Sequence, residues 1–170
     1  MIGFADRLVT ELNRLGVHFV TGGEPEGLVL PLSPVELLAG LTAQSEARLS
    51  LALIPLLLVH PELAAAVPEA LIRLAEREQL TLKLFYTAAV ILQQFHAEQL
   101  RALLGRYDPL PDHFAAELGI PTSGYYVNQL KYLGERHRTL SGLAINWVGT
   151  YHHAADRLLK QFTLEVQWLR

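Results

Sequence analysis

The sequence predicts one all-α domain over residues 1–170, and three observations support this prediction. Apolar residues recur at helical spacing along most of the chain, helix-capping signals separate these stretches, and β-like runs are confined to one short N-terminal part. A chain of 170 residues can bury about two thirds of the surface that it exposes when unfolded. We therefore expect a compact domain of six to eight helices around one core, with at most one small N-terminal β-hairpin.

The first predicted helix covers residues 3–15, where apolar residues recur at helical spacing and Gly16 follows as a left-handed stop. The runs VHFV and GLVLPL come next and predict a hairpin within residues 17–32, in which Pro31 restricts pairing to one edge. Residues 33–36, Ser-Pro-Val-Glu, have the capping-box pattern with proline at the first helical position. The second helix is therefore expected to begin there.

Short helices are expected to follow one another through the middle of the chain. Residues 45–59 form a helical stretch that Pro55 breaks or kinks, and the apolar run inside it is about half as long as the ~20 residues that a bilayer requires. The sequences HPE at 60–62 and VPE at 67–69 each indicate the end of one helix and the start of another. Residues 81–104 contain no proline or glycine and are apolar around most of the helix, which is typical of a central helix.

The sequence GRYDPLPD interrupts the helical pattern, and its two prolines make residues 105–111 the candidate hinge between subdomains. A helical pair with a glycine-centred turn is expected over 114–135, and a last helix from about 151 to 168. This arrangement leaves a single domain with one candidate point of articulation.

The composition indicates a protein that binds other proteins or itself. The chain is 51% apolar and 18% charged, an excess that predicts either a thick core or apolar surface reserved for a partner or for a homo-oligomer. The chain contains no cysteine, which excludes disulfides and thiolate chemistry and favours a cytoplasmic location. The N-terminus is amphipathic and unlike a secretion signal, and we expect no membrane span.

The distribution of charge bears on nucleic-acid binding. Residues 1–100 carry 6 Lys/Arg against 11 Asp/Glu, whereas residues 101–170 carry 8 against 6. If any part of the chain contacts nucleic acid, it is therefore the C-terminal part. A net charge of +2 is nevertheless far from the basic stripe that phosphate binding usually needs, and ordinary solvated faces are the favoured interpretation.

Residues 112–138 form a candidate helix-turn-helix, which would make the chain a DNA-binding regulator. The sequence Leu-Gly-Ile at 118–120 resembles winged-helix regulators, although the turn that follows is longer than theirs and three tyrosines occupy the expected DNA-facing surface. Amide side chains would bond adenine edges, and basic side chains would contact phosphate. The candidate contacts are Asn128, Gln129, Lys131, Arg136 and Arg138. A structural helical hairpin is the favoured interpretation.

A second alternative is a ribonuclease. Arg106 and His113 are separated by six residues, a spacing that resembles the loose Arg-spacer-His pattern of HEPN ribonucleases, which are small all-α enzymes. The resemblance implies that Arg106 stabilises phosphate charge and that His113 moves protons. The intervening sequence departs from that family because its two prolines prevent one continuous helix.

A metal site is the weakest candidate, and we expect neither a metal nor another cofactor. His152 and Asp156 share a helix face at i and i+4, and a third ligand would have to come from elsewhere, for instance His137. A partly exposed histidine beside a helical aspartate explains the same spacing. The glycine-rich sequence TGGEPEG has two glutamates and no lysine, so it would repel phosphate.

Three segments, LFYTAAVILQQFH, LPDHFAAELGIP and GLAINWVGTYHHAADRLL, together cover less than a third of the chain. They resemble segments of small bacterial all-α proteins that are associated with nucleotidyltransferase-like genes of the abortive-infection or toxin–antitoxin type. The resemblance implies an antitoxin-like, non-catalytic partner of such an enzyme and carries over no site residue. Our leading hypothesis is therefore a non-enzymatic protein-interaction module.

Overall fold

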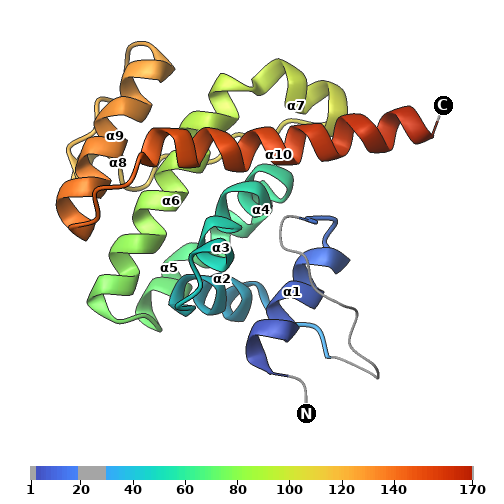
Figure 1. The fold of residues 1–170 in the computed structure, drawn as a ribbon, viewed down its shortest axis with the longest axis horizontal. Coiled ribbons are helices and arrows are strands. Elements are labelled where there is room, and N and C mark those ends of the chain that lie inside the picture. Colours follow the sequence, from blue (N-terminus) through green and yellow to red (C-terminus); the bar gives the residue numbers. More distant parts are fainter. Residues whose placement is uncertain (1–2, 19–29, 170) are drawn as a thin grey trace.

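Helices account for all regular secondary structure in the part of the chain that the computed structural model describes, residues 3–18 and 30–169 (Figure 1). The all-α prediction is confirmed. The hairpin expected within 17–32 falls mainly on residues 19–29, which lie outside the described residues. The elements are α1 (Phe4–Arg14), α2 (Pro34–Ala43), α3 (Ala47–Leu51), α4 (Leu53–Val59), the 3-10 helix η1 (Pro61–Ala66), α5 (Val67–Ile72), α6 (Glu76–Phe95), α7 (Ala97–Leu104), α8 (Ala115–Leu118), α9 (Tyr126–Ser141) and α10 (Trp147–Trp168).

Helix α6 lies at the centre of the fold, as expected for the long uninterrupted apolar segment. It packs against α2, α4, α7, α9 and α10, and every residue from 84 to 93 is buried. Helix α10 crosses α6 in Figure 1 and also contacts α4, α7 and α9. The core is therefore built around one helix that is apolar on all sides, with the other helices arranged around it.

The break in the 45–59 stretch lies at Ala52, between α3 and α4, and the prediction of a kink at Pro55 is wrong in position. Pro55 is the third residue of α4, where the backbone N–H would have no partner within the helix, so a proline costs little there. A second break, at His96, divides the expected 81–104 helix into α6 and α7. These breaks yield more segments than the six to eight expected.

Two helices begin earlier than expected because a side chain caps each of them. The Glu78 carboxylate accepts a hydrogen bond from the Ala75 N–H at 3.0 Å, so α6 begins before residue 81. The Asn146 Oδ1 atom accepts one from the Gly149 N–H at 3.0 Å, so α10 begins before residue 151. Ser33 caps α2 as expected, with its Oγ accepting from the Glu36 N–H at 3.2 Å, while the Glu36 carboxylate accepts from the Ser33 hydroxyl and not from its backbone N–H.

The apolar run in α4 is part of the core, because all seven residues of this helix are buried. Among the described helices, none is by itself both long enough and apolar enough to cross a membrane. The stretches 47–59 and 61–72 reach that length and composition only as a pair, and the pair is bent by 118°.

The candidate hinge runs alongside α6, and buried side chains of α6 hold it there. Gln93 donates to the Asp108 carbonyl at 2.8 Å and accepts from the Leu110 N–H at 2.7 Å. Tyr86 donates its hydroxyl hydrogen to the Pro111 carbonyl at 2.6 Å. We call residues 105–113 the strap. These side chains satisfy backbone N–H and carbonyl groups of the strap, which forms no helix or strand of its own.

We predict that the strap opens only when α6 unfolds. The Leu110 amide should exchange hydrogen as slowly as the amides of α6, because it is buried and bonded to Gln93. The substitution Gln93→Leu should speed exchange at Leu110 and lower the free energy of unfolding by about 1–3 kcal/mol, since it leaves a buried N–H without a partner. Gln94→Leu, at an exposed neighbouring position, is the matched control. Fast exchange at Leu110 in the unmodified protein would instead establish residues 105–111 as a hinge.

Close packing of α9 on α10 depends on a glycine. A Cβ atom at Gly134 would lie 2.8 Å from the Cγ2 atom of Val148 and 3.7 Å from the Cβ atom of Trp147. The Val148 side chain branches at Cβ, so its methyl group cannot turn away without changing rotamer. The angle between the two helices is therefore maintained by the absence of a side chain at Gly134.

Gly134→Ala should lower the free energy of unfolding by about 1–3 kcal/mol through overpacking, even though alanine favours helix by about 1 kcal/mol over glycine. In a Val148→Ala background the clash is removed, and the same change should be neutral or stabilising. Chemical denaturation of the unmodified protein, the two single variants and the double variant forms a double-mutant cycle, which measures the coupling energy between residues 134 and 148. Equal effects of Gly134→Ala in both backgrounds would contradict the role of this contact.

Candidate functional site

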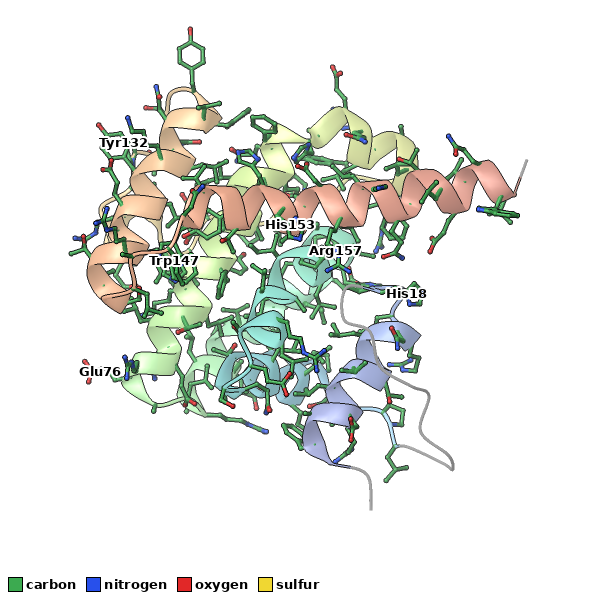
Figure 2. The ribbon with its side chains drawn as sticks, viewed as in Figure 1. His18, Glu76, Tyr132, Trp147, His153 and Arg157 are labelled. Carbon is green, nitrogen blue, oxygen red and sulfur yellow. The ribbon has the colours of Figure 1, made fainter. Side chains whose placement is uncertain are left out.

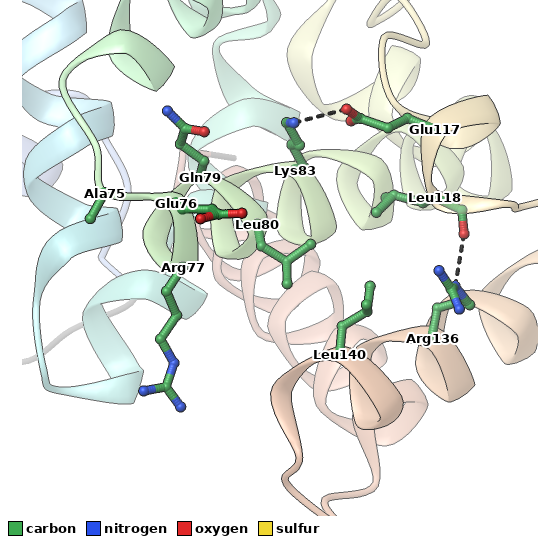
Figure 3. A pocket seen from close by; sticks show the side chains of 10 residues that line it. All are labelled: Ala75, Glu76, Arg77, Gln79, Leu80, Lys83, Glu117, Leu118, Arg136 and Leu140. Carbon is green, nitrogen blue, oxygen red and sulfur yellow. Dashed lines mark hydrogen bonds and ion pairs between the residues drawn. The ribbon is translucent and has the colours of Figure 1, made fainter.

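A groove lies between α6 and the corner where α9 meets α10. It consists of two adjoining hollows that share Arg77, Leu80 and Leu140. The hollow over the start of α10 has a volume of about 390 Å³, and we call it the apolar lobe. The hollow towards α8 has a volume of about 720 Å³, and we call it the charged lobe (Figure 3).

Stacked aromatic rings line the inner side of the apolar lobe. The His137 and Trp147 rings are parallel within 7° with centroids 3.5 Å apart, and Phe85 meets His137 edge-on at 5.3 Å. The Nδ1 atom of His137 is hydrogen-bonded to the hydroxyl of the fully buried Tyr151 at 2.6 Å. Trp147 stands at the corner between α9 and α10 (Figure 2). The cluster joins three helices, since Phe85 belongs to α6.

Burial determines the protonation of this cluster. It lowers the pKa of His137 to about 4, and it raises the pKa of Tyr151 well above its usual range. His137 is therefore neutral near pH 7, with only 3% of its surface exposed. The inner side of the apolar lobe consequently carries no charge at that pH.

Apolar side chains also stand at the opening of the apolar lobe. Leu143 and Ile145, in the connection between α9 and α10, are 53% and 46% exposed, and Leu140 at the end of α9 is 37% exposed. Polar side chains also line this lobe, namely Thr42, Gln44, Ser45, Ser50, Thr81, Ser141 and Thr150. A groove of this kind suits an apolar ligand or peptide segment.

The charged lobe has basic and acidic side chains from α6, α8 and α9 (Figure 3). Lys83 pairs with the Glu117 carboxylate at 3.0 Å, and the Nε atom of Arg136 donates to the Leu118 carbonyl at 2.9 Å. The guanidinium of Arg77 has no hydrogen-bond or ion-pair partner within residues 3–18 and 30–169. Arg77 lines both lobes and is exposed.

The predicted nucleic-acid contacts divide into two groups on α9. The buried Gln129 donates to the Pro121 carbonyl at 3.0 Å, and Arg136 bonds the Leu118 carbonyl, so both hold the α8–α9 turn together. Asn128, Lys131 and Arg138 lie on the exposed side. Helix α8, which would be the first helix of a helix-turn-helix, has only four residues.

Exposed aromatic residues gather at the beginning of α9. Tyr125 is 81% exposed, Val127 59% and Tyr132 52%. Tyr132 is labelled on α9 in Figure 2. Tyr126 is 40% exposed, and its ring lies 6.5 Å from that of Phe95 on α6, itself 41% exposed. We call these five residues the aromatic face.

Arg106 and His113 make contacts with different helices. An Nη atom of Arg106 lies 3.4 Å from the Val59 carbonyl at the end of α4 and 3.4 Å from the Glu62 carboxylate in η1. The His113 ring is stacked on that of Tyr86 in α6, with centroids 5.5 Å apart. Among the described residues, the side chains of Arg106 and His113 form no hydrogen bond or ring contact with each other.

His152 and Asp156 lie on α10 beside His96 at the start of α7. The pKa of His96 is lowered, mainly by burial. The negative charge of Asp156 opposes this shift, and the neighbouring His152 adds to it. The Nε2 atom of His96 is buried and has no hydrogen-bond partner among the residues that the structure describes. Within residues 3–18 and 30–169, no group of three or more histidine, aspartate or glutamate side chains is arranged to hold a metal, and His137 is stacked within the aromatic cluster instead.

No protein-family model, no curated protein and no solved structure matches this chain.

The groove was missed by the sequence reasoning because its residues come from segments far apart in the chain. Leu80 and Arg77 precede the segment predicted to be helical, and the residues of α9 were considered for DNA binding rather than for their inner face. One signal was available in the sequence GLAINW, where Leu143 and Ile145 interrupt helical periodicity next to Trp147. Large apolar residues in a connection are a sign of an exposed apolar surface.

Protonation of His137 should couple stability to pH. Its pKa is about 4 in the folded protein against an ordinary value of 6.5, so the unfolded chain binds more protons between these values. The contribution to stability is fully present above pH 6.5 and falls by up to about 1.4 kcal/mol per pH unit as the pH drops towards 4. Urea unfolding between pH 7 and 4.5 should show this slope in the unmodified protein and a shallower slope in His137→Asn.

The matched control for that experiment is His153→Asn, an exposed position on α10 (Figure 2). Its slope should equal that of the unmodified protein, because the slope compares protonation in two states and does not depend on absolute stability. If His137→Asn keeps the full slope, the ring of His137 is protonated in the folded protein near its ordinary pKa.

Proposed function

We propose that this chain is a non-enzymatic protein-interaction module that binds its partner through the aromatic face. The observation that carries the proposal is the exposure of three tyrosines, a valine and a phenylalanine at one end of α9 and the adjoining end of α6. Tyrosine offers a large contact area with few rotatable bonds, so binding orders it at a low cost in entropy. Such residues are enriched among those that carry most of the energy of protein interfaces.

Polar side chains on the next turns of α9 complete the arrangement. Asn128, Lys131, Glu135 and Arg138 are all exposed, and they border the tyrosines with both signs of charge. A mixed polar rim around an aromatic centre is the usual composition of a protein interface. The rim would set orientation and the rate of association, and the aromatic residues would supply most of the affinity.

The positions of the enzyme candidates support binding over catalysis. Arg106 and His113 contact separate elements, and His137 is neutral and enclosed by other rings. A general acid or base must reach the reacting group of a substrate, whereas His137 is buried and bonded to the buried Tyr151 hydroxyl. These observations favour a binding role, which agrees with the leading hypothesis from the sequence.

The same surface suits protein better than nucleic acid. Two of the five candidate contacts, Gln129 and Arg136, are engaged with backbone carbonyls, which leaves only Lys131 and Arg138 to meet phosphate. Two cations beside Glu135 supply little of the electrostatic attraction on which nucleic-acid binding depends. A nucleotidyltransferase-type enzyme remains the predicted partner class from sequence resemblance, and a second copy of the chain is the other candidate.

The experiment is purification of the tagged protein from its native cell, followed by light scattering and mass spectrometry of what accompanies it. We expect a stoichiometric protein companion. Changing Tyr125 and Tyr132 together to alanine should weaken that complex about 10²–10³-fold, since central aromatic contacts contribute about 2 kcal/mol each. Both side chains are largely exposed, so the fold should be retained.

The matched control changes Lys131 and Arg138 to alanine on the same helix. It should weaken a protein complex less than tenfold, because rim charges contribute little at physiological salt. A companion that is nucleic acid, released by moderate salt and by this control variant, would contradict the proposal and favour the DNA-binding regulator. Unchanged binding by the tyrosine variant would also overturn it.

A further inference from the structure

The groove is a second binding surface that shares no residue with the aromatic face, and its chemistry differs. We infer that it binds a small amphipathic carboxylate, with the apolar body of the ligand in the apolar lobe and the carboxylate on Arg77. The inference is independent of the proposed partner binding and rests on the size, lining and charge of the groove.

Size favours a small molecule. The apolar lobe has a volume of about 390 Å³ and opens into the charged lobe of about 720 Å³. Pockets for metabolites and drug-sized molecules have volumes of about 300–1,000 Å³ and are lined mainly by apolar and aromatic side chains. Each lobe falls within that range, and the apolar lobe has the expected lining.

The lining selects an apolar body. Leu84, Phe85 and Trp147 form the inner side, and Leu143 and Ile145 border the opening. The last two are about half exposed, so a ligand that covers them removes apolar surface from water. Burial of apolar surface contributes a favourable free energy of about 25 cal/mol per Å². The neutral His137 adds no charge, and the remaining polar side chains of the lobe, such as Thr42, Ser50 and Thr150, are uncharged. An uncharged, mainly apolar body therefore matches this lobe.

The charges around the groove select the other end of the ligand. Lys83 is paired with Glu117, and Arg136 is bonded to a backbone carbonyl. Arg77, at the junction of the two lobes, is the cation there without a partner among the described residues. A guanidinium matches the two oxygens of a carboxylate with two parallel hydrogen bonds.

Nearby acidic groups favour a single negative charge. Glu76, next to Arg77 in the sequence, also lines the charged lobe, together with Glu117 (Figure 3). A phosphate dianion placed on Arg77 would be repelled by Glu76 more strongly than a carboxylate would. The charge pattern therefore fits a monoanion with an apolar body.

The test uses decanoate as the probe and decanol as its uncharged counterpart, both below the concentrations at which they aggregate. The chain has two tryptophans, and Trp168 is 87% exposed, so Trp168→Phe leaves Trp147 as the single fluorescent reporter inside the groove. We expect a saturable change in Trp147 emission with decanoate and a weaker one with decanol. Calorimetric titration of the unmodified protein measures the same binding without relying on fluorescence.

Arg77→Gln should weaken decanoate binding about tenfold or more and leave decanol binding unchanged, because only the carboxylate loses a charge-assisted contact. Arg138→Gln, an exposed arginine that does not line the groove, is the matched control and should change neither. Ile145→Asn, at the opening of the apolar lobe, should weaken both ligands alike.

Absence of saturable heat and fluorescence change with decanoate would overturn the inference, as would an equal loss for Arg77→Gln and Arg138→Gln. Equal loss of decanoate and decanol binding in Arg77→Gln would show that the arginine does not hold the carboxylate. None of these outcomes bears on the companion protein, whose binding depends on Tyr125 and Tyr132. The failure of one proposal is thus distinguishable from the failure of the other.

Discussion

The fold depends on the burial of one helix on all sides. Every residue of α6 from 84 to 93 is shielded from water, and a helix that is apolar around its circumference can be stable only if other elements cover each of its faces. Helices α2, α4, α7, α9 and α10 supply that cover. Both proposed binding surfaces lie beside α6, one at the groove along its first half and the other at Phe95, its last residue.

Much of the fold could be predicted because its signals are local. The N-cap at Ser33, the proline starts at Pro61 and Pro68, and the unbroken apolar segment of α6 all depend on residues close in sequence. The predicted helix boundaries were wrong where one residue type is compatible with two local structures. Pro55 is compatible with a kink or with the first turn of a helix, and only the position of the break at Ala52 distinguishes them.

The candidate sites were less predictable because they depend on burial and on contacts between distant segments. Gln129 and Arg136 have side chains suited to nucleic acid, yet the α8–α9 turn requires both of them to satisfy its carbonyl groups. Arg77 and Ile145 are far apart in the chain and meet at the groove only because α9 folds back along α6. Residue type alone cannot reveal such contacts between distant segments, whereas Tyr125, Tyr126 and Tyr132 lie within eight residues of one another and are visible in the sequence as a local concentration of tyrosine.

The attachment of the strap has a consequence for how this chain tolerates change. The side-chain amide of Gln93 donates to the carbonyl of one peptide group and accepts from the N–H of the next, as the backbone of a neighbouring β-strand would. Pro109, between those two groups, lacks an N–H that the arrangement does not use. Gln93 therefore bonds only backbone atoms of the strap, and these bonds do not depend on which side chains the strap carries. Substitutions at the exposed Asp108 and Pro109 should be accepted readily, whereas inserting or deleting one residue there would shift every bonded amide out of reach.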